Sequence, residues 1–167
     1  SKPELSIELI KSMQHKGIGT HAMKLLLQAY VPQDNFEYYR WVVATDNYPS
    51  QHLCEKIGGI PNGIVALILK DPKLQEIFEE NNLDMIDDQF RLIADKFKVE
   101  PRKLLSHSLE YKICPESWMG SSIGSKIEIQ APKIKAIDRE YIKTSIRHRI
   151  DCMGYGTYSK CYKISVV

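Results

Sequence analysis

The sequence predicts an α/β fold in which helices flank a mixed sheet, and three observations support this class. Residues 4–10 alternate polar and apolar side chains, the period-two pattern of a strand with one buried face. Residues 38–45 and 64–69 are rich in aromatic, β-branched or other apolar residues and are predicted as further strands. The stretches between these strands contain good helix formers at helical spacing. The β-α-β-α-β order over residues 4–70 predicts some parallel strand pairing.

The predicted first strand leads into a glycine-bearing loop, residues 14–20, before a helix predicted to run to Tyr30. The loop contains Gly17 and Gly19 and no proline. Glycine lets the backbone come close to an anion, and the first free amides of a helix point at that anion with the positive end of the helix dipole behind them. The pattern therefore predicts a phosphate-binding device, although a tight strand-to-helix turn without a ligand has the same glycine pattern.

A second, shorter helix is predicted to open at residues 46–50 and to continue to about Ile57. Asn47 is a suitable N-cap, and Pro49 fits an early helical position. Gly58 and Gly59 end the helix, because glycine takes the left-handed conformation at little cost. Residues 61–63, Pro-Asn-Gly, then predict a turn ahead of the strand at 64–69.

The character of the chain changes after residue 70, which we take as a boundary between a region at 1–70 and an α+β extension at 71–167. Three short helices are predicted first, and the second of these is amphipathic. The predicted helices are Pro72–Asn81, Met85–Lys98 and Pro101–Ser108, and the strand-like stretches that follow are 109–114, 126–130, 141–150 and 161–167.

The composition is that of an ordinary globular domain, with 43% hydrophobic and 26% charged residues. A net charge of +2 is too mild to imply a nucleic-acid partner, which is not expected. No apolar run approaches the ~18 residues of a membrane span. The spacing of the four cysteines matches no zinc pattern, so no metal is expected. We expect a cytoplasmic protein with free thiols, although a bridge between Cys152 and Cys161 is an alternative in an oxidising compartment.

Two blocks of the sequence resemble the GNAT superfamily of acyl-CoA-dependent N-acetyltransferases. Residues 14–19, Gln-His-Lys-Gly-Ile-Gly, match the family's acetyl-CoA motif, Gln/Arg-x-x-Gly-x-Gly/Ala between a strand and a helix. Asn47, Ser50 and residues 53–59 resemble the Asn-x-x-Ser…Glu-Lys-x-Gly-Phe segment that follows in the family. The second block is most similar to the branch that acetylates ribosomal-protein N-termini and related amines. The resemblance covers residues 4–70 and implies a GNAT-like mixed sheet with flanking helices.

The resemblance also implies a role for each matching residue in the transfer of an acetyl group from acetyl-CoA to a primary amine. Backbone amides of the loop would bind the CoA pyrophosphate, and the members of this set are Gln14, His15, Lys16, Gly17, Ile18, Gly19 and Thr20. The Leu9 amide would polarise the thioester carbonyl as negative charge develops. Ile10 and Lys11 would pair with the pantetheine amides, and Asn47 and Ser50 would contact the cofactor arm.

The chain departs from the family pattern at two points. Many members carry a tyrosine that protonates the departing thiolate, and Cys54 stands at the matching position. Cys54 is therefore a candidate proton donor, with a small buried hydrophobe as the alternative. Glu8 is a candidate general base acting through water, and a solvated strand carboxylate is its alternative. The second departure is that the family's substrate-binding N-terminal half has no match. An upstream segment, a partner chain or homodimer, or residues 71–167 would have to supply it.

Two other functions are alternatives to an active transferase. A catalytically degenerate GNAT-like module would keep the cofactor site or the fold and serve in binding or regulation. A DNA-binding module through residues 86–108 is ranked last. There, an amphipathic helix and a segment with Arg102 and Lys103 resemble a helix-turn-helix, but Lys98 replaces the usual turn glycine.

Overall fold

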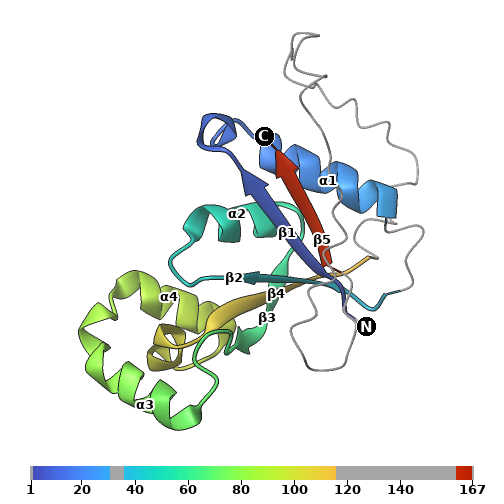
Figure 1. The fold of residues 1–167 in the computed structure, drawn as a ribbon. Helices are drawn as coiled ribbons and strands as arrows, with labels where there is room; N and C mark the ends of the chain where they lie inside the picture. Colours follow the sequence, from blue (N-terminus) through green and yellow to red (C-terminus); the bar gives the residue numbers. More distant parts are fainter. Residues whose placement is uncertain (1, 31–35, 116–160, 167) are drawn as a thin grey trace. The chain divides into compact units, whose positions relative to one another are not determined.

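The computed structural model describes residues 2–30, 36–115 and 161–166, and it is a mixed α/β structure as predicted (Figure 1). The chain forms two compact units. The first comprises Ser1–Tyr39 together with Cys114–Val167, and the second comprises Arg40–Ile113. Both parallel and antiparallel strand pairs occur, which confirms the predicted mixed sheet with flanking helices. The two units do not test the proposal that residues 1–70 and 71–167 have different roles, so that proposal stays a prediction.

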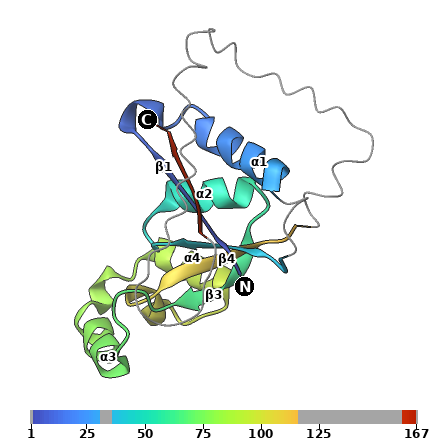
Figure 2. The same ribbon diagram turned by 45° about the vertical axis from the view of Figure 1, so that its right-hand side comes forward.

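The first unit contains the predicted strand–loop–helix. Strand β1 (Glu4–Leu9) is followed by the 3₁₀ turn η1 (Lys11–Met13) and helix α1 (Ile18–Tyr30). Strand β5 (Cys161–Val166) pairs with β1 in parallel along its whole length, and the two lie side by side in both views (Figures 1 and 2). The unit thus joins segments from the two ends of the chain. The buried apolar side chains of β1 and α1 are Leu5, Met23, Leu26 and Leu27.

The sheet of the second unit has the order β3-β4-β2. Strand β2 is Tyr39–Val43, β3 is Ile60–Val65 and β4 is Ser108–Ile113. Glu110 on the middle strand joins all three strands through its carboxylate. It accepts hydrogen bonds from Arg40 on β2, with Nε at 2.8 Å and Nη2 at 2.6 Å, and from Asn62 Nδ2 on β3 at 2.7 Å. This charge-assisted arrangement fixes the relative register of the strands.

The predicted turn at residues 61–63 is wrong, and the strand predicted at 64–69 is present as β3 but with different bounds. The strand starts at Ile60, passes through Pro61 with an irregularity in its pairing between Pro61 and Gly63, and ends at Val65. Proline is tolerated at a bulge, where no ladder hydrogen bond is required from it, and Gly63 supplies the positive φ of 129°. The apolar run therefore continues past the strand, and Ile68 is 91% exposed.

Helix α2 (Tyr48–Lys56) begins and ends as predicted. The Asn47 side chain caps it by accepting a hydrogen bond from the Ser50 amide at 3.2 Å. At the C-terminus Gly58 has φ = 91°, and two bonds form a Schellman motif: Gly58 N to Glu55 O at 3.0 Å and Gly59 N to Cys54 O at 2.9 Å. The left-handed residue is thus Gly58, as the sequence indicated.

A helical segment separates β3 from β4, and α3 and α4 lie near each other in both views (Figures 1 and 2). Its elements are α3 (Pro72–Asn81), η2 (Leu83–Met85), α4 (Asp88–Phe97) and η3 (Pro101–Leu105). The first predicted helix is confirmed, α4 starts three residues later than predicted, and the third is a 3₁₀ helix. Phe97 is buried and its ring packs edge-on against Tyr111 of β4, with ring centroids 5.0 Å apart.

The turn after α4 makes Lys98 a testable position, because it is a non-glycine residue with φ = 55°. Lys98 N bonds to Asp95 O at 3.2 Å and Val99 N to Ala94 O at 3.0 Å, so Lys98 occupies the glycine position of a Schellman motif. Lys98→Gly is expected to raise the free energy of unfolding by about 1 kcal/mol, measured by urea denaturation. Lys98→Ala removes the same charge but keeps the Cβ, so an equal gain from alanine would contradict the backbone explanation.

Several predictions fall outside the described residues. These are the strands expected at 126–130 and 141–150 and the alternative bridge from Cys152. In the described part of the chain, Cys54 is a free thiol. Within that same part, no group of three or more His, Cys, Asp or Glu side chains could hold a metal ion, and no helix is long and apolar enough to cross a membrane.

Candidate functional site

The candidate anion loop, residues 14–20, follows β1 and η1, and its first residue is hydrogen-bonded to the end of β1. Gln14 Nε2 donates to the Leu9 carbonyl at 3.1 Å, and the 3₁₀ turn is held by Met13 N to Ile10 O at 2.9 Å. His15 has φ = 57° and Gly17 has φ = 74°, so the backbone turns twice through the left-handed region within three residues. Glycine adopts this conformation without strain, which explains its presence at position 17.

The start of α1 presents amides that the helix itself does not use. The bond from His21 N to Gly17 O, 3.1 Å long, is at the first helical turn, so the amides of Ile18, Gly19 and Thr20 have no acceptor within the helix. The first turn contains no acidic residue, and a Cβ added to Gly17 would meet nothing within 4 Å. An open backbone surface at a positive helix end, with no competing carboxylate, fits a phosphate group.

The structure brings the first group of predicted site residues together around this loop. Glu8 is exposed near the end of β1, and Leu9 is the last residue of the strand, opposite Val166 of β5. Ile10 is 41% exposed and precedes η1, which begins with the exposed Lys11. All four therefore lie on the strand end and turn that lead into the loop. The roles of these residues toward a cofactor remain predictions.

Asn47 and Ser50 belong to the second unit, where both have structural contacts. Asn47 is the N-cap of α2, as described above. Ser50 Oγ accepts a hydrogen bond from the Trp41 indole, Nε1, at 3.2 Å. Because a hydroxyl both donates and accepts, the Ser50 proton is still available for a further partner. Capping and cofactor contact are compatible at these two positions, and the structure establishes the capping.

Cys54 lies on the inner side of α2 and is fully buried. Burial, reinforced by the neighbouring Glu55 carboxylate, raises the pKa of the Cys54 thiol to about 12. Such a thiol is inert as a nucleophile, because the thiolate is the reactive form. This environment is the one expected of the small buried hydrophobe considered above. A role for Cys54 as proton donor remains untested.

Beside Cys54, the Glu55 carboxylate joins three elements of the second unit. Its Oε1 accepts from the Tyr111 hydroxyl of β4 at 2.8 Å and forms an ion pair with Lys96 of α4. Burial alone would raise the pKa of Glu55, but the hydrogen bonds from Lys96 and Tyr111 outweigh it and the pKa is lowered. Burial and the bond to Glu55 raise the pKa of Tyr111. Glu55 therefore stays ionised and anchors α2 to the rest of the unit.

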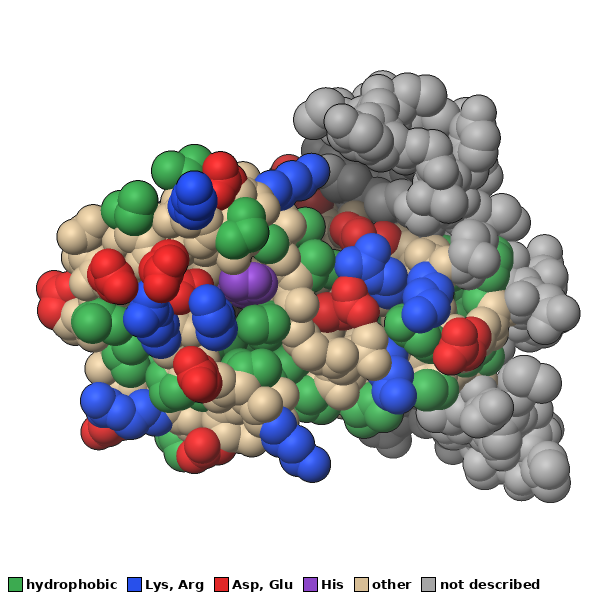
Figure 3. Space-filling view, turned by 90° about the horizontal axis from the view of Figure 1, so that it is seen from below, with side chains coloured by type: hydrophobic (Ala, Val, Ile, Leu, Met, Phe, Trp, Pro, Cys, Tyr) green, Lys and Arg blue, Asp and Glu red, His purple; other side chains and the backbone are tan. Residues whose placement is uncertain are grey.

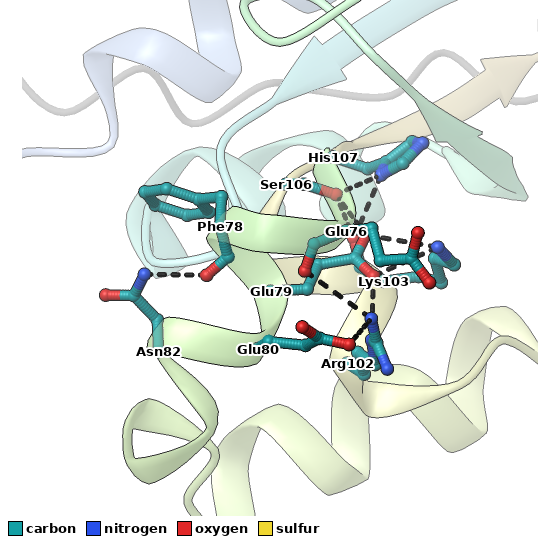
Figure 4. A network of polar contacts seen from close by, with 9 residues as sticks. All are labelled: Glu76, Phe78, Glu79, Glu80, Asn82, Arg102, Lys103, Ser106 and His107. Atoms are coloured by element: carbon teal, nitrogen blue, oxygen red, sulfur yellow. Dashed lines mark hydrogen bonds and ion pairs between the residues drawn. The ribbon is translucent and has the colours of Figure 1, made fainter. Parts of the chain in front are cut away.

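A second polar network surrounds Glu79 of α3, which is fully buried (Figure 4). Its carboxylate accepts from Arg102 Nε at 2.9 Å, from Lys103 Nζ at 3.0 and 3.2 Å, and from Ser106 Oγ at 2.6 Å. His107 Nδ1 lies 2.7 Å from Ser106 Oγ and 3.1 Å from the Lys103 carbonyl. The carbonyl can only accept, so Nδ1 carries a proton and the Ser106 hydroxyl is free to donate to Glu79.

This network bears directly on the helix-turn-helix alternative. Lys98 does adopt the left-handed turn conformation that glycine usually supplies, so the turn geometry of the motif is present. The second helix, however, is only the five-residue 3₁₀ turn η3, and its basic residues Arg102 and Lys103 are bound to Glu79. Phosphate contacts need such cations to be available. The contacts thus favour the other account of this segment, a helix pair that packs on the sheet.

The partners of Glu79 cannot be identified from the sequence. Burial alone would raise its pKa, but the hydrogen bonds from Ser106, Lys103 and Arg102 outweigh that effect and the pKa of Glu79 lies below its ordinary value. Glu79 lies on the helix side opposite the apolar residues of α3, so the helical pattern alone predicts that it faces solvent. Its acceptor role depends on residues more than twenty positions away, which no local pattern identifies.

Comparison with known proteins agrees with the geometry of the loop. Residues 4–59 match the family model described as acetyltransferase (GNAT) family. The match spans β1, the loop, α1, β2 and α2, and it ends at Gly59. It supports the GNAT superfamily, whose members are acetyltransferases that generally use acetyl-CoA as the acyl donor. No curated protein and no solved structure matches the chain significantly.

Proposed function

We propose that this chain carries the cofactor-binding part of an N-acetyltransferase that moves an acetyl group from acetyl-CoA to a primary amine. The observation that carries the proposal is the loop at the start of α1. Its free amides, its left-handed Gly17 and the absence of acids in the first helical turn suit a diphosphate. The family match over residues 4–59 includes this loop and supports acetyl-CoA as the ligand.

In this proposal the residues of the chain position acetyl-CoA and polarise its thioester carbonyl, and none of them forms a covalent intermediate. The loop amides of residues 14–20 hold the pyrophosphate, and Ile10 and Lys11 hold the pantetheine arm. The Leu9 amide donates to the thioester carbonyl oxygen as the amine attacks, which lowers the energy of the developing oxyanion. Glu8 accepts the ammonium proton through water, and its exposed position at the strand end is compatible with that task. Asn47 and Ser50 contact the cofactor arm.

The acceptor is a primary amine, either a small molecule or a protein N-terminus. The block at residues 47–59 resembles the ribosomal-protein branch, which favours a protein N-terminus. The wall that selects the acceptor is supplied by residues 71–167, by an upstream segment, or by a partner chain such as a second copy. We propose a cytoplasmic location, where acetyl-CoA and such acceptors are available.

A degenerate binding module is the second candidate, and one observation favours it. Cys54, at the position where many family members have tyrosine, is fully buried, and the pKa of its thiol is raised, which makes proton donation harder. A module of this kind would bind acetyl-CoA without transferring its acetyl group. Release of CoA in the presence of a panel of amines, including peptides with free N-termini, distinguishes a transferase from a module.

An isosteric pair of substitutions at Gly17 tests the anion loop. Asn and Asp both tolerate the left-handed conformation better than other non-glycine residues, and the open space beside Gly17 accommodates either side chain. Gly17→Asp is expected to weaken acetyl-CoA binding by at least about tenfold relative to Gly17→Asn, because it adds a negative charge where the pyrophosphate lies. Isothermal titration calorimetry measures both dissociation constants.

Two outcomes of this titration would count against the proposed site. The wild-type chain could show no binding of acetyl-CoA, which would remove the proposed function. Alternatively, Gly17→Asp and Gly17→Asn could bind equally well, which would place the diphosphate away from the loop. Position 17 is a sharper test than position 19, because Gly19 is buried and any side chain there would disturb packing as well as binding.

A further inference from the structure

Helix α3 has its apolar side chains on the side that faces solvent. Leu74, Ile77 and Phe78, spaced i, i+3 and i+4, are 53%, 55% and 41% exposed. We call these three residues the α3 stripe. The residues that face the protein are polar: Glu79 is fully buried in its network, and Gln75 Nε2 donates to the Leu69 carbonyl at 2.6 Å. Figure 4 shows Phe78 pointing away from the Glu79 contacts.

This orientation is the reverse of an ordinary surface helix, whose apolar side packs on the core. The inward side of α3 is fixed by ion pairs to Arg102 and Lys103, so the helix cannot rotate the stripe inward without breaking them. Leu83 and Met85 on η2, 49% and 57% exposed, follow the stripe along the chain. One face of the molecule accordingly carries hydrophobic side chains among acidic and basic ones (Figure 3).

The charges that flank the α3 stripe are complementary to the same charges on a second, antiparallel copy. Lys73 near the N-terminus of α3 and Glu80 near its C-terminus are both exposed and lie two turns apart on the same flank. Glu80 also forms a 3.6 Å ion pair with Arg102, which leaves its side chain 59% exposed. When two copies of one helix pack antiparallel, each flank meets the same flank of its partner. With Ile77 near the two-fold axis, Leu74 then faces Phe78 of the other copy, and Lys73 lies near its Glu80. The antiparallel arrangement also opposes the two helix dipoles favourably.

We propose that the α3 stripe is a homodimer interface, in which two copies of this chain pack through antiparallel α3 helices. The interface is isologous, since the same residues of both copies meet across a two-fold axis. It buries the Leu74, Ile77 and Phe78 side chains and places two Lys73–Glu80 pairs at the rim. A contact built on one short helix and its neighbour η2 is small, so the association is weak and concentration-dependent.

Sedimentation equilibrium of the full chain, at concentrations up to about 200 µM, tests this interface. The wild type is expected to show a monomer–dimer equilibrium. Ile77→Glu places two carboxylates at the axis and is expected to raise the dimer dissociation constant by about 30-fold or more. Leu92→Glu is the matched control, because Leu92 is 63% exposed on α4 and lies outside the stripe; it is expected to leave the dissociation constant unchanged.

Exchanging the charges at positions 73 and 80 distinguishes a homodimer from a complex with a different protein. Lys73→Glu alone should weaken the dimer, because it would face Glu80 of the other copy. The double variant Lys73→Glu/Glu80→Lys should restore it, which only a partner with the same two substitutions allows. Glu80→Lys alone is the control for the loss of the ion pair between Glu80 and Arg102. Circular dichroism confirms that each variant is folded. A strictly monomeric wild type, a dimer that survives Ile77→Glu, or a double variant as weak as Lys73→Glu would each overturn the proposal.

Discussion

Replacing Glu79 with alanine is expected to lower the free energy of unfolding by about 2–4 kcal/mol. The carboxylate is fully buried and is the common acceptor for Arg102, Lys103 and Ser106. Its removal leaves a cavity and three donors without their shared acceptor. The side chains of Arg102 and Lys103 are 33% and 42% exposed, so water can partly solvate them, and this keeps the loss below the largest values for buried ion pairs.

Glu80→Ala is the matched control for this substitution. Glu80 is the next residue of α3, its side chain is 59% exposed, and its ion pair with Arg102 spans 3.6 Å. Exposed pairs of this kind contribute about 0–1 kcal/mol. Chemical denaturation of both variants gives the comparison. Equal losses from the two substitutions would mean that the buried network does not stabilise the helical segment.

The pH dependence of stability provides a second measurement on Glu79. Its pKa in the folded protein is lowered from the ordinary value of 4.5, so the unfolded state binds the proton more readily. The stabilisation by Glu79 is therefore complete above the unfolded pKa and is lost as the pH falls from about 4.5 through the lower folded value. The wild type should lose more stability than Glu79→Ala over this range, and parallel pH profiles would contradict the assignment.

Gly59→Ala is expected to lower the free energy of unfolding by about 1–3 kcal/mol. A Cβ at Gly59 would overlap the Cys54 sulfur and lie 2.8 Å from the Cys54 carbonyl oxygen. Neither atom can move freely, because Cys54 is buried and its carbonyl accepts the Gly59 amide of the Schellman motif. The substitution thus forces the end of α2 away from the strand that follows.

A double-mutant cycle with Cys54→Ala tests whether the sulfur causes this effect. Removing the sulfur relieves one of the two overlaps, so Gly59→Ala should cost about 1 kcal/mol less in the Cys54→Ala background. If the losses of stability from Gly59→Ala and Cys54→Ala simply add, the effect of Gly59→Ala comes from the overlap with the Cys54 carbonyl and not from the sulfur.

The elements that could be predicted from the sequence are those with local determinants. Strand β1 follows from the alternation of polar and apolar residues. The start of α2 follows from Asn47 and its end from Gly58. The first helix of the segment between β3 and β4 was predicted at Pro72–Asn81 and has these bounds. The strand, the glycine-bearing turn and the helix around residues 14–20 could also be predicted, and the role of this loop as an anion site stays a prediction.

The parts that the sequence did not reveal depend on distant contacts. Residues 61–63 have the composition of a turn, yet they form part of β3 because β4 pairs with them from more than forty residues away. The apolar run at 64–69 has no partner strand beyond Val65, which leaves Ile68 exposed. Likewise β5 pairs with β1 across almost the whole chain, and Glu79 is buried only because η3 supplies its donors.

The pairing of β3 with β4 has a consequence for how the second unit folds. Val65 and Ser108 face each other at one end of the ladder, so residues 66–107 form one long excursion from a single hairpin. Closing so large a loop costs entropy before any strand contact compensates for it. The excursion consists of α3, η2, α4 and η3, whose internal contacts are shorter in sequence than the pairing of β3 with β4. We therefore expect this helical segment to pack first and to bring its ends together, so that β4 completes the sheet afterwards.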